Sequence, residues 1–208
     1  RSTPDRSSAA SDVYKRQGQD RLRISVKREP AGAETPAGRV SNALHDRLQE
    51  GGVLDVAPPQ GDFHLREDNA APVVLVSGGV GLTPMVSMLN HLVSTDDPRQ
   101  IRFVHGCRNG AAHAMKDHVN AVAAARGNVR KAVFYEEVTR GDQPGRDYDH
   151  AGRVDLHAIR DQAIVPDADY YLCGPAGFMR AQRETLLALG VAADRIHAEA
   201  FGSGGAPV

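Results

Sequence analysis

The chain has 208 residues, with 25 Lys+Arg against 26 Asp+Glu and a formal net charge of −1. This balance gives no electrostatic basis for binding nucleic acid or an anionic membrane surface. The longest apolar runs are too short to span a bilayer, and the first residues contain no apolar signal-peptide core. Cys107 and Cys173 form neither a disulfide framework nor a CxxC motif, so we expect a cytoplasmic protein.

The first third of the chain carries weak signals. Residues 1–20 show no hydrophobic period, and we expect a disordered or foreign leader there. Arg21–Lys27 alternates apolar and polar residues as a half-buried strand does. A short helix is expected over Asn42–Leu48 and a second strand over Val53–Ala57. We interpret residues 21–69 as a partial antiparallel β-barrel that binds FAD.

From residue 70 to residue 208 the pattern changes to short apolar strands that alternate with helices. The expected strands are Val73–Val76, Ile101–His105, Lys131–Tyr135, Tyr170–Leu172 and one near Ile196–Phe201. The expected helices are Pro84–Leu92, Ala112–Ala125, Val154–Gln162 and Phe178–Leu189. This alternation predicts an α/β domain with a doubly wound parallel sheet covered on both faces. Such sheets bind ligands at the carboxyl ends of their strands.

The strongest motif is the stretch Val73–Met85, which reads VVLVSGGVGLTPM. A buried strand runs into a glycine-rich turn that opens a helix, and the turn consists of Gly79, Val80, Gly81, Leu82, Thr83 and Pro84. Free N–H groups at a helix start, and glycines that allow close approach of the backbone, suit a pyrophosphate. Thr83 can cap the helix, and Pro84 fits its first turn. Because Pro84 stands where a G-x-G-x-x-G fingerprint has its third glycine, a tight turn without a ligand is the alternative.

A second turn of this kind lies in YLCGPAGFM, Tyr171–Met179. Cys173 at the strand end would face the cleft, and Gly174 and Pro175 would open it; a small buried thiol is the alternative. Arg108, after the second strand, would contact a phosphate or be an exposed loop arginine. The nine histidines lack metal-ligand spacing, so we expect no metal site. A hydrogen-bonded core histidine is the favoured interpretation of His105.

Seven motifs follow one another after the leader. They are VKRE (Val26–Glu29), GRVSNALH (Gly38–His45), PQGDF (Pro59–Phe63), SGGVGLTPM (Ser77–Met85), HGCRNGAAHAM (His105–Met115), YLCGPAGFM and IHAEAFG (Ile196–Gly202). In order and spacing they resemble the reductase part of bacterial flavohaemoglobins, the nitric oxide dioxygenases, within the ferredoxin–NADP reductase superfamily. The glycine turns alone would indicate only the superfamily, whereas VKRE, VSNALH and AEAFG indicate flavohaemoglobins.

The resemblance implies an oxidoreductase that transfers hydride from NADH or NADPH to FAD and passes electrons to haem in a globin domain, for nitric oxide detoxification. It implies that the turn from Gly79 to Pro84, with Arg108, Gly174 and Pro175, binds the nicotinamide dinucleotide. It implies catalytic roles for Cys173 beside the nicotinamide and for Glu199 beside the flavin. The FAD contacts that it implies are Val40, Ser41, Asn42, Ala200, Phe201, Gly202 and Ser203.

The chain departs from the family pattern before residue 21. The family's R-x-Y-S flavin motif has no counterpart at Tyr14–Arg16, and the sequence contains no globin domain. The resemblance therefore implies an N-terminally truncated chain with a complete dinucleotide half and a weak hold on FAD. The alternatives are a stand-alone NAD(P)H–flavin or ferredoxin-type reductase, and a dinucleotide-binding module without turnover. We expect a monomer.

The choice between NADH and NADPH depends on the residues after the third strand of the sheet. Tyr135 is followed there by Glu136 and Glu137. Carboxylates prefer a ribose hydroxyl to a 2′-phosphate, so the sequence favours NADH. Arg140 is close enough in sequence to favour NADPH instead.

Overall fold

The computed structural model describes residues 10–12, 23–33, 35–56 and 61–200. The strands are β1 (Ala10–Asp12), β2 (Arg23–Ser25), β3 (Val73–Gly78), β4 (Ile101–Cys107), β5 (Val129–Tyr135), β6 (His150–Ala151), β7 (Asp169–Gly174) and β8 (Ile196–Ala200). The helices are α1 (Arg39–Arg47), α2 (Leu82–Ser94), α3 (Lys116–Ala125), α4 (Arg160–Ala163) and α5 (Ala176–Ala188), with 3-10 turns η1 (Gly79–Gly81), η2 (Gly110–Ala112) and η3 (Ala193–Arg195).

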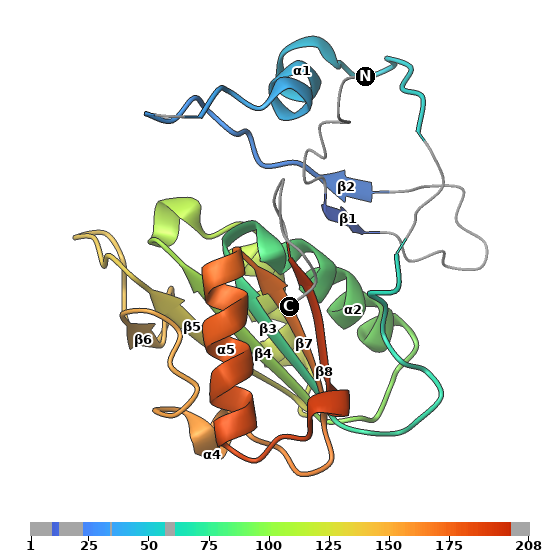
Figure 1. Ribbon diagram of the computed structural model, residues 1–208, viewed down its shortest axis with the longest axis vertical. Coiled ribbons are helices and arrows are strands. Elements are labelled where there is room, and N and C mark those ends of the chain that lie inside the picture. Colours follow the sequence, from blue (N-terminus) through green and yellow to red (C-terminus); the bar gives the residue numbers. More distant parts are fainter. Residues whose placement is uncertain (1–9, 13–22, 34, 57–60, 201–208) are drawn as a thin grey trace.

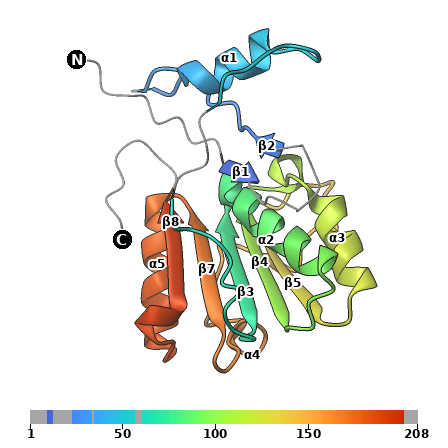
Figure 2. The same ribbon diagram turned by 90° about the vertical axis from the view of Figure 1, so that its right-hand side faces the viewer.

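The centre of the fold is a parallel six-stranded sheet with the order β6-β5-β4-β3-β7-β8. All six residues of β3 and all six of β7 are buried, as expected for central strands covered on both faces. Figure 2 shows α2 and α3 on one face of the sheet and α5 on the other. The predicted doubly wound α/β class is therefore confirmed.

Each face of the sheet has its own hydrophobic core because successive strand residues point in opposite directions. Leu75 of β3 packs with Met85 and Leu89 of α2 on one face. Val76, the next residue along β3, packs with Met179 of α5 on the other face. The helices supply these contacts from positions three to four residues apart, which lie on one side of a helix.

The strand order reverses at β3, because β4 and β5 lie on one side of it and β7 and β8 on the other. The loops after β3 and β7 leave the sheet in opposite directions from this point, and ligands of open α/β sheets bind there. In both views α1, β1 and β2 lie beyond this carboxyl edge of the sheet (Figures 1 and 2).

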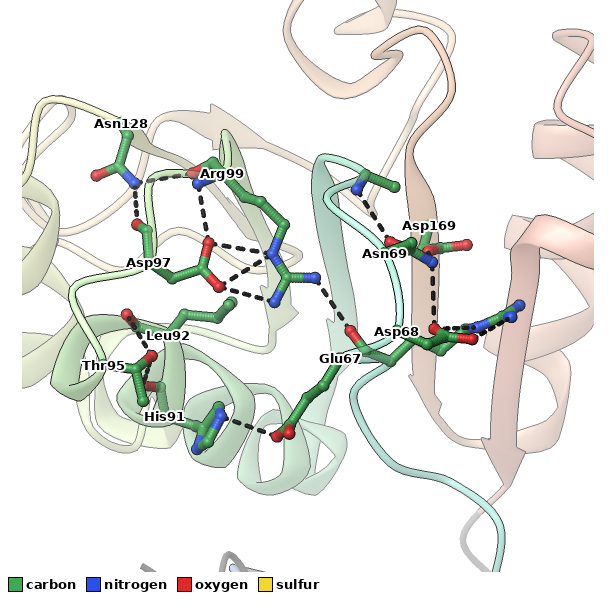
Figure 3. Close-up of polar contacts among 12 residues, drawn as sticks. Glu67, Asp68, Asn69, His91, Leu92, Thr95, Asp97, Arg99, Asn128 and Asp169 are labelled. Atoms are coloured by element: carbon green, nitrogen blue, oxygen red, sulfur yellow. Dashed lines mark hydrogen bonds and ion pairs between the residues drawn. The ribbon is translucent and has the colours of Figure 1, made fainter.

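The segment before β3, residues 61–72, is called the linker here. Hydrogen bonds hold it along the sheet toward the amino ends of the strands, as Figure 3 shows. The backbone N–H of Arg66 donates to the Tyr171 hydroxyl at 2.9 Å, and Arg99 Nη1 donates to the Arg66 carbonyl at 3.0 Å. Asn69 Nδ2 donates to Asp169 Oδ2 at 3.1 Å. Leu65 is 2% exposed and packs into the α2-side core. The linker therefore covers the part of this face beside β7.

Several predicted elements differ from the structure. Residues 53–56 form no strand, and Val53 is 91% exposed, because no described strand pairs with this segment; Ala57 lies outside the described residues. The predicted helix over Val154–Gln162 is only the short α4. Asp155 Oδ1 accepts the N–H of Ala158, as the cap of a helix does, but residues 156–159 form only turns before α4 begins at Arg160.

Two further differences concern segments without an apolar signal. Residues 10–12, within the predicted leader, form β1 and pair antiparallel with β2. The edge strand β6 is only two residues long, too short for a hydrophobic period to reveal it. The described part of residues 21–69 contains β2 and α1, and the partial barrel and the domain limits remain predictions.

Candidate functional site

The glycine turns after β3 and β7 meet at the reversal point of the sheet. β3 and β7 are neighbours, with Ser77 opposite Cys173 in the register. A Cβ atom on Gly81 would overlap the carbonyl oxygen of Cys173, so only glycine allows this contact between the two backbones. Gly79 has φ = 55°, which favours glycine, and no atom lies within 4 Å of the place where its Cβ would be. One glycine thus packs the turns together, and the other faces open space.

Phe178 covers the two strand ends from the α5 side. A Cβ atom on Gly174 would lie 2.8 Å from the Phe178 ring, and one on Gly78 would lie 3.1 Å from it. Sequence reasoning identified Gly174 and the helix that follows but missed Gly78 and Phe178 as partners. The only sequence signal for this contact was the occurrence of small residues at both strand ends.

Two helices begin at this edge. α2 starts at Leu82 and α5 at Ala176, and neither has a side-chain cap. Their first N–H groups and the positive ends of their dipoles favour an anion. Pro175 and Gly177 are exposed between the turns, whereas Leu82 is buried. The edge therefore combines an electropositive character with an accessible backbone.

Thr83 does not cap α2. It lies inside the first turn, is 4% exposed, and donates its hydroxyl to the carbonyl of Val80 at 3.1 Å. The cap position is Gly81, because the 3-10 turn η1 already provides the backbone bonds at the helix start. Pro84 occupies the first turn as predicted, where its missing N–H leaves no bond unmade.

Cys173 is fully buried and belongs to the α2-side core, so the prediction that it faces an open cleft is wrong. On this face Phe63 of the linker packs edge-on against Tyr171, with 6.1 Å between ring centroids. Burial, and secondarily the charge of Glu199, raises the pKa of the Cys173 thiol. The thiol is therefore protonated and is not a nucleophile.

Glu199 lies in β8, directly opposite Cys173 in the register. Glu199 Oε1 is 3.8 Å from the position that a Cβ atom on Gly61 would occupy. The residue is exposed as a whole, yet partial burial of the carboxylate raises its pKa. The backbone of Ala200 pairs with Gly174 next to it, whereas Phe201, Gly202 and Ser203 lie outside the described residues.

Arg108 lies at the carboxyl end of β4, the strand next to β3, and is exposed. Its carbonyl accepts the N–H of Glu137 at 2.8 Å, so the loops after β4 and β5 run side by side. The structure thus brings Arg108 to the same sheet edge as the turns at Gly79 and Gly174.

Val40, Ser41 and Asn42 lie on α1, apart from the turns. Asn42 Nδ2 donates to the carbonyls of Glu29 and Gly38 at 2.9 and 2.7 Å, and the Ser41 hydroxyl donates to Gly38 at 3.3 Å. These side chains fasten α1 to the chain before it. Val40 is 41% exposed and offers apolar surface.

A buried polar row that the sequence did not predict runs from β3 over β4 to β5. Ser77 Oγ lies 2.9 Å from His105 Nδ1, and His113 Nδ1 lies 2.9 Å from the Tyr135 hydroxyl. The two histidine rings are 5.1 Å apart. His105 is 1% exposed, which confirms its interpretation as a hydrogen-bonded core histidine.

Within the described residues, no group of three or more His, Cys, Asp or Glu could hold a metal ion. In the same part of the chain, no helix is long and apolar enough to cross a membrane.

Comparisons with known proteins identify the family. Residues 75–184 match the oxidoreductase NAD-binding domain family. The flavohemoprotein of Bordetella pertussis is 68% identical over 184 residues, which cover 88% of this chain and 45% of the relative. That of Chromobacterium violaceum is 53% identical over 182 residues, covering 88% of this chain and 45% of the relative. This chain thus spans less than half the length of these relatives.

One similar solved structure is matched by this chain over most of that structure's own length. The flavohem-like FAD/NAD-binding domain of nitric oxide dioxygenase from Vibrio cholerae is 33% identical, with a TM-score of 0.70. The match covers 88% of this chain and 72% of that domain. The chain therefore belongs to the oxidoreductase NAD-binding domain family and, within it, to the reductase regions of flavohaemoglobins.

Proposed function

We propose that this chain is the reductase unit of a flavohaemoglobin-type nitric oxide dioxygenase. It takes a hydride from NAD(P)H onto FAD, and the electrons continue to haem in a globin domain of the complete protein. The observation that carries the proposal is the meeting of two glycine turns and two helix starts at the reversal point of the sheet. This arrangement is the pyrophosphate site expected of a dinucleotide-binding sheet.

The residues present fit a nicotinamide dinucleotide. Gly79 faces open space, and Pro175 and Gly177 form an exposed surface between the helix starts. The turn from Gly79 to Pro84 would hold the pyrophosphate through backbone N–H groups and helix dipoles. Arg108, at the end of the next strand, would add a positive charge.

Bound FAD would supply the hydride acceptance and one-electron chemistry, and the protein would supply position and exclusion of water. Cys173, protonated and buried, would lie in the core beneath the nicotinamide end and would take no part in the reaction. Glu199, whose partly buried carboxylate has a raised pKa, would be the group at the nicotinamide end that can hold a proton. Its position opposite Cys173 supports these roles.

The contacts to FAD would come from α1 and from the end of β8. Ser41 and Asn42 already bond the backbone of this chain, so we assign the α1 contribution to exposed backbone and to the apolar surface of Val40. Ala200, Phe201, Gly202 and Ser203 would surround the flavin ring. We also place the protein in the cytoplasm as a monomer; its two cysteines are buried and unpaired, which suits a reducing compartment.

Two titrations of the purified chain test the proposal. Isothermal titration calorimetry with ADP-ribose and with NADH is expected to show one site for each ligand. Added FAD is expected to saturate, and NADH should then bleach the flavin absorbance. Binding of NADH without any uptake of FAD would leave only a dinucleotide-binding module, and absence of NADH binding would contradict the proposed function altogether.

We further propose a preference for NADH over NADPH, supported by the position of the two glutamates. Backbone bonds from Glu136 to Cys107 and from Glu137 to Arg108 hold both residues at the carboxyl edge beside the Arg108 loop. There a carboxylate would accept from a ribose hydroxyl and repel a 2′-phosphate.

We expect the Kd for NADPH to exceed that for NADH by about tenfold, which corresponds to about 1.4 kcal/mol. Glu137→Arg should remove most of this difference. Glu184→Arg, the same charge change at an exposed position of α5, is the matched control and should keep it. Calorimetric Kd values for both nucleotides check the prediction, and an equal or tighter Kd for NADPH with the unmodified chain would contradict it.

A further inference from the structure

One carboxylate joins the loops that follow β4 and β5. Asp142 Oδ1 accepts the backbone N–H of Gly110 at 3.1 Å. Asp142 Oδ2 accepts the N–H of Thr139 at 2.7 Å and the Thr139 hydroxyl at 2.8 Å. Residues 110 and 142 are far apart in sequence, so the carboxylate ties two separate loops together.

The fit at this contact is tight. A Cβ atom on Gly110 would overlap Asp142 Oδ1, so glycine is the residue that allows the carboxylate to reach the backbone. The N–H of Thr139, then its hydroxyl and the N–H of Gly110, hold the pKa of Asp142 below its usual range. The group is therefore a charged acceptor at any physiological pH.

Only a carboxylate can make this connection. Its two oxygens both accept hydrogen bonds, one from each loop. An asparagine of the same size has one acceptor oxygen and one donor NH₂ group. If its oxygen faces Gly110, its NH₂ group meets the N–H of Thr139, and two donors face each other.

The loops that Asp142 joins carry the charged residues at this edge. Arg108 precedes Gly110 by two residues, and Glu137 precedes Thr139 by two. The dinucleotide would cross the edge with its pyrophosphate at the turns of β3 and β7. Since Cys173 and Glu199 lie on the β7 side, its adenosine half would extend over β4 and β5 on the other side.

We infer that Asp142 is a positioning residue for the adenosine half of the dinucleotide. It does not touch the ligand but fixes the distance between the loops of Arg108 and Glu137. The inference rests on the proposed function, because it requires a dinucleotide at this edge. It predicts that loss of the carboxylate weakens the binding of any ligand that contains the ADP moiety.

The experiment compares Asp142→Asn with the unmodified chain by calorimetry, using ADP-ribose and NADH. We expect Kd to rise about tenfold for both ligands and by the same factor, because only the shared half loses its support. The melting temperature should change by no more than about 3 °C, because the substitution alters a contact between two loops and leaves the sheet and its two cores unchanged. A purely structural role would lower the melting temperature without this common change in Kd.

Two further variants complete the test. Asp149→Asn is the matched control. Asp149 also lies between β5 and β6 and accepts a backbone N–H, that of Val133 at 2.9 Å, but this bond does not join the Gly110 loop. The control should change Kd less than twofold. Gly110→Ala pushes the same loops apart from the other side, so it should reproduce the effect of Asp142→Asn, and the double variant should add little more.

The outcomes separate the two proposals. Binding by the unmodified chain together with an unchanged Kd for Asp142→Asn, or for Gly110→Ala if the first variant does not fold, would overturn the role of Asp142 and leave the proposed function intact. Failure of the unmodified chain to bind either ligand would overturn both.

Discussion

Gly81→Ala is expected to lower the free energy of unfolding by about 3 kcal/mol, the upper range for overpacking a close contact. A methyl group at this position would overlap the carbonyl oxygen of Cys173, which is backbone of the central strand β7 and has no rotamer by which to move aside. The turn after β3 must then separate from the turn after β7. A change of this size corresponds to a fall of about 6–12 °C in the melting temperature.

The same substitution should weaken dinucleotide binding. The two helix starts stabilise an anion only while their N–H groups converge on one place, and separation of the turns moves them apart. We expect the Kd for NADH to rise by at least tenfold, measured by calorimetry well below the melting temperature of the variant.

Two glycines nearby provide matched controls. Gly79→Ala introduces no overlap but forces a residue with a Cβ to keep φ = 55°, so it should cost about 1 kcal/mol. Gly177→Ala lies in the first turn of α5, where no atom lies within 4 Å of the added methyl group, and should be neutral or slightly stabilising. Urea unfolding measures the free energy of unfolding of the three variants. Equal losses of this free energy in all three would contradict the role of the Gly81–Cys173 contact.

The sheet could be predicted from sequence because its central strands are continuous apolar runs. Val73–Val76 needed only extension by two residues to become β3. By contrast, the sequence predicts a helix over Val154–Gln162, yet Val154 and Leu156 are buried in an irregular segment before the short α4. Apolar residues in a sequence report which positions are buried, but they do not decide whether a short buried segment is a helix or a series of turns.

Some parts of the candidate site could likewise be predicted from the sequence, and others could not. Glycines predicted the two turns because tight backbone geometry leaves a sequence signal. The direction of the Cys173 side chain left none, since it depends on the alternation within β7 and on the linker that packs on that face. The pairing of Gly110 with Asp142, and of Gly78 with Phe178, joins segments distant in sequence. Such contacts arise only when the fold brings the segments together.

The buried histidine pair is expected to make the fold sensitive to acid. Burial, and then the neighbouring His113, lowers the pKa of His105 to about 3. Burial, followed by the charges of Lys116 and Lys131, lowers the pKa of His113 to about 4. Both values lie below the usual 6.5, because the folded protein holds the two rings neutral in a hydrogen-bonded row.

The direction of the effect follows from proton uptake. Below about pH 6.5 the unfolded chain protonates both histidines, whereas the folded chain does not. The free energy of unfolding is therefore at its full value above pH 6.5 and falls as the pH decreases toward 4, by up to about 1.4 kcal/mol per unit for each ring. Between pH 6.5 and 4.5 we expect a loss of about 2 kcal/mol per histidine.

Urea unfolding at pH 7.0, 5.5 and 4.5 measures this loss. His105→Asn keeps a polar group near Ser77 and does not titrate, so it should halve the pH dependence while lowering the free energy of unfolding at pH 7. His113→Asn should behave in the same way beside Tyr135. Asp142 and Asp147, whose pKa values are lowered by bonds to Thr139 and Lys116, lose their contribution mainly below about pH 4. Burial raises the pKa of Glu199, which therefore opposes the loss on acidification, so the differences between the histidine variants and the unmodified chain report on the pair. A free energy of unfolding that stays constant over this interval would show that the folded protein accepts protons on the pair, and that the row from Ser77 to Tyr135 opens to water at little cost.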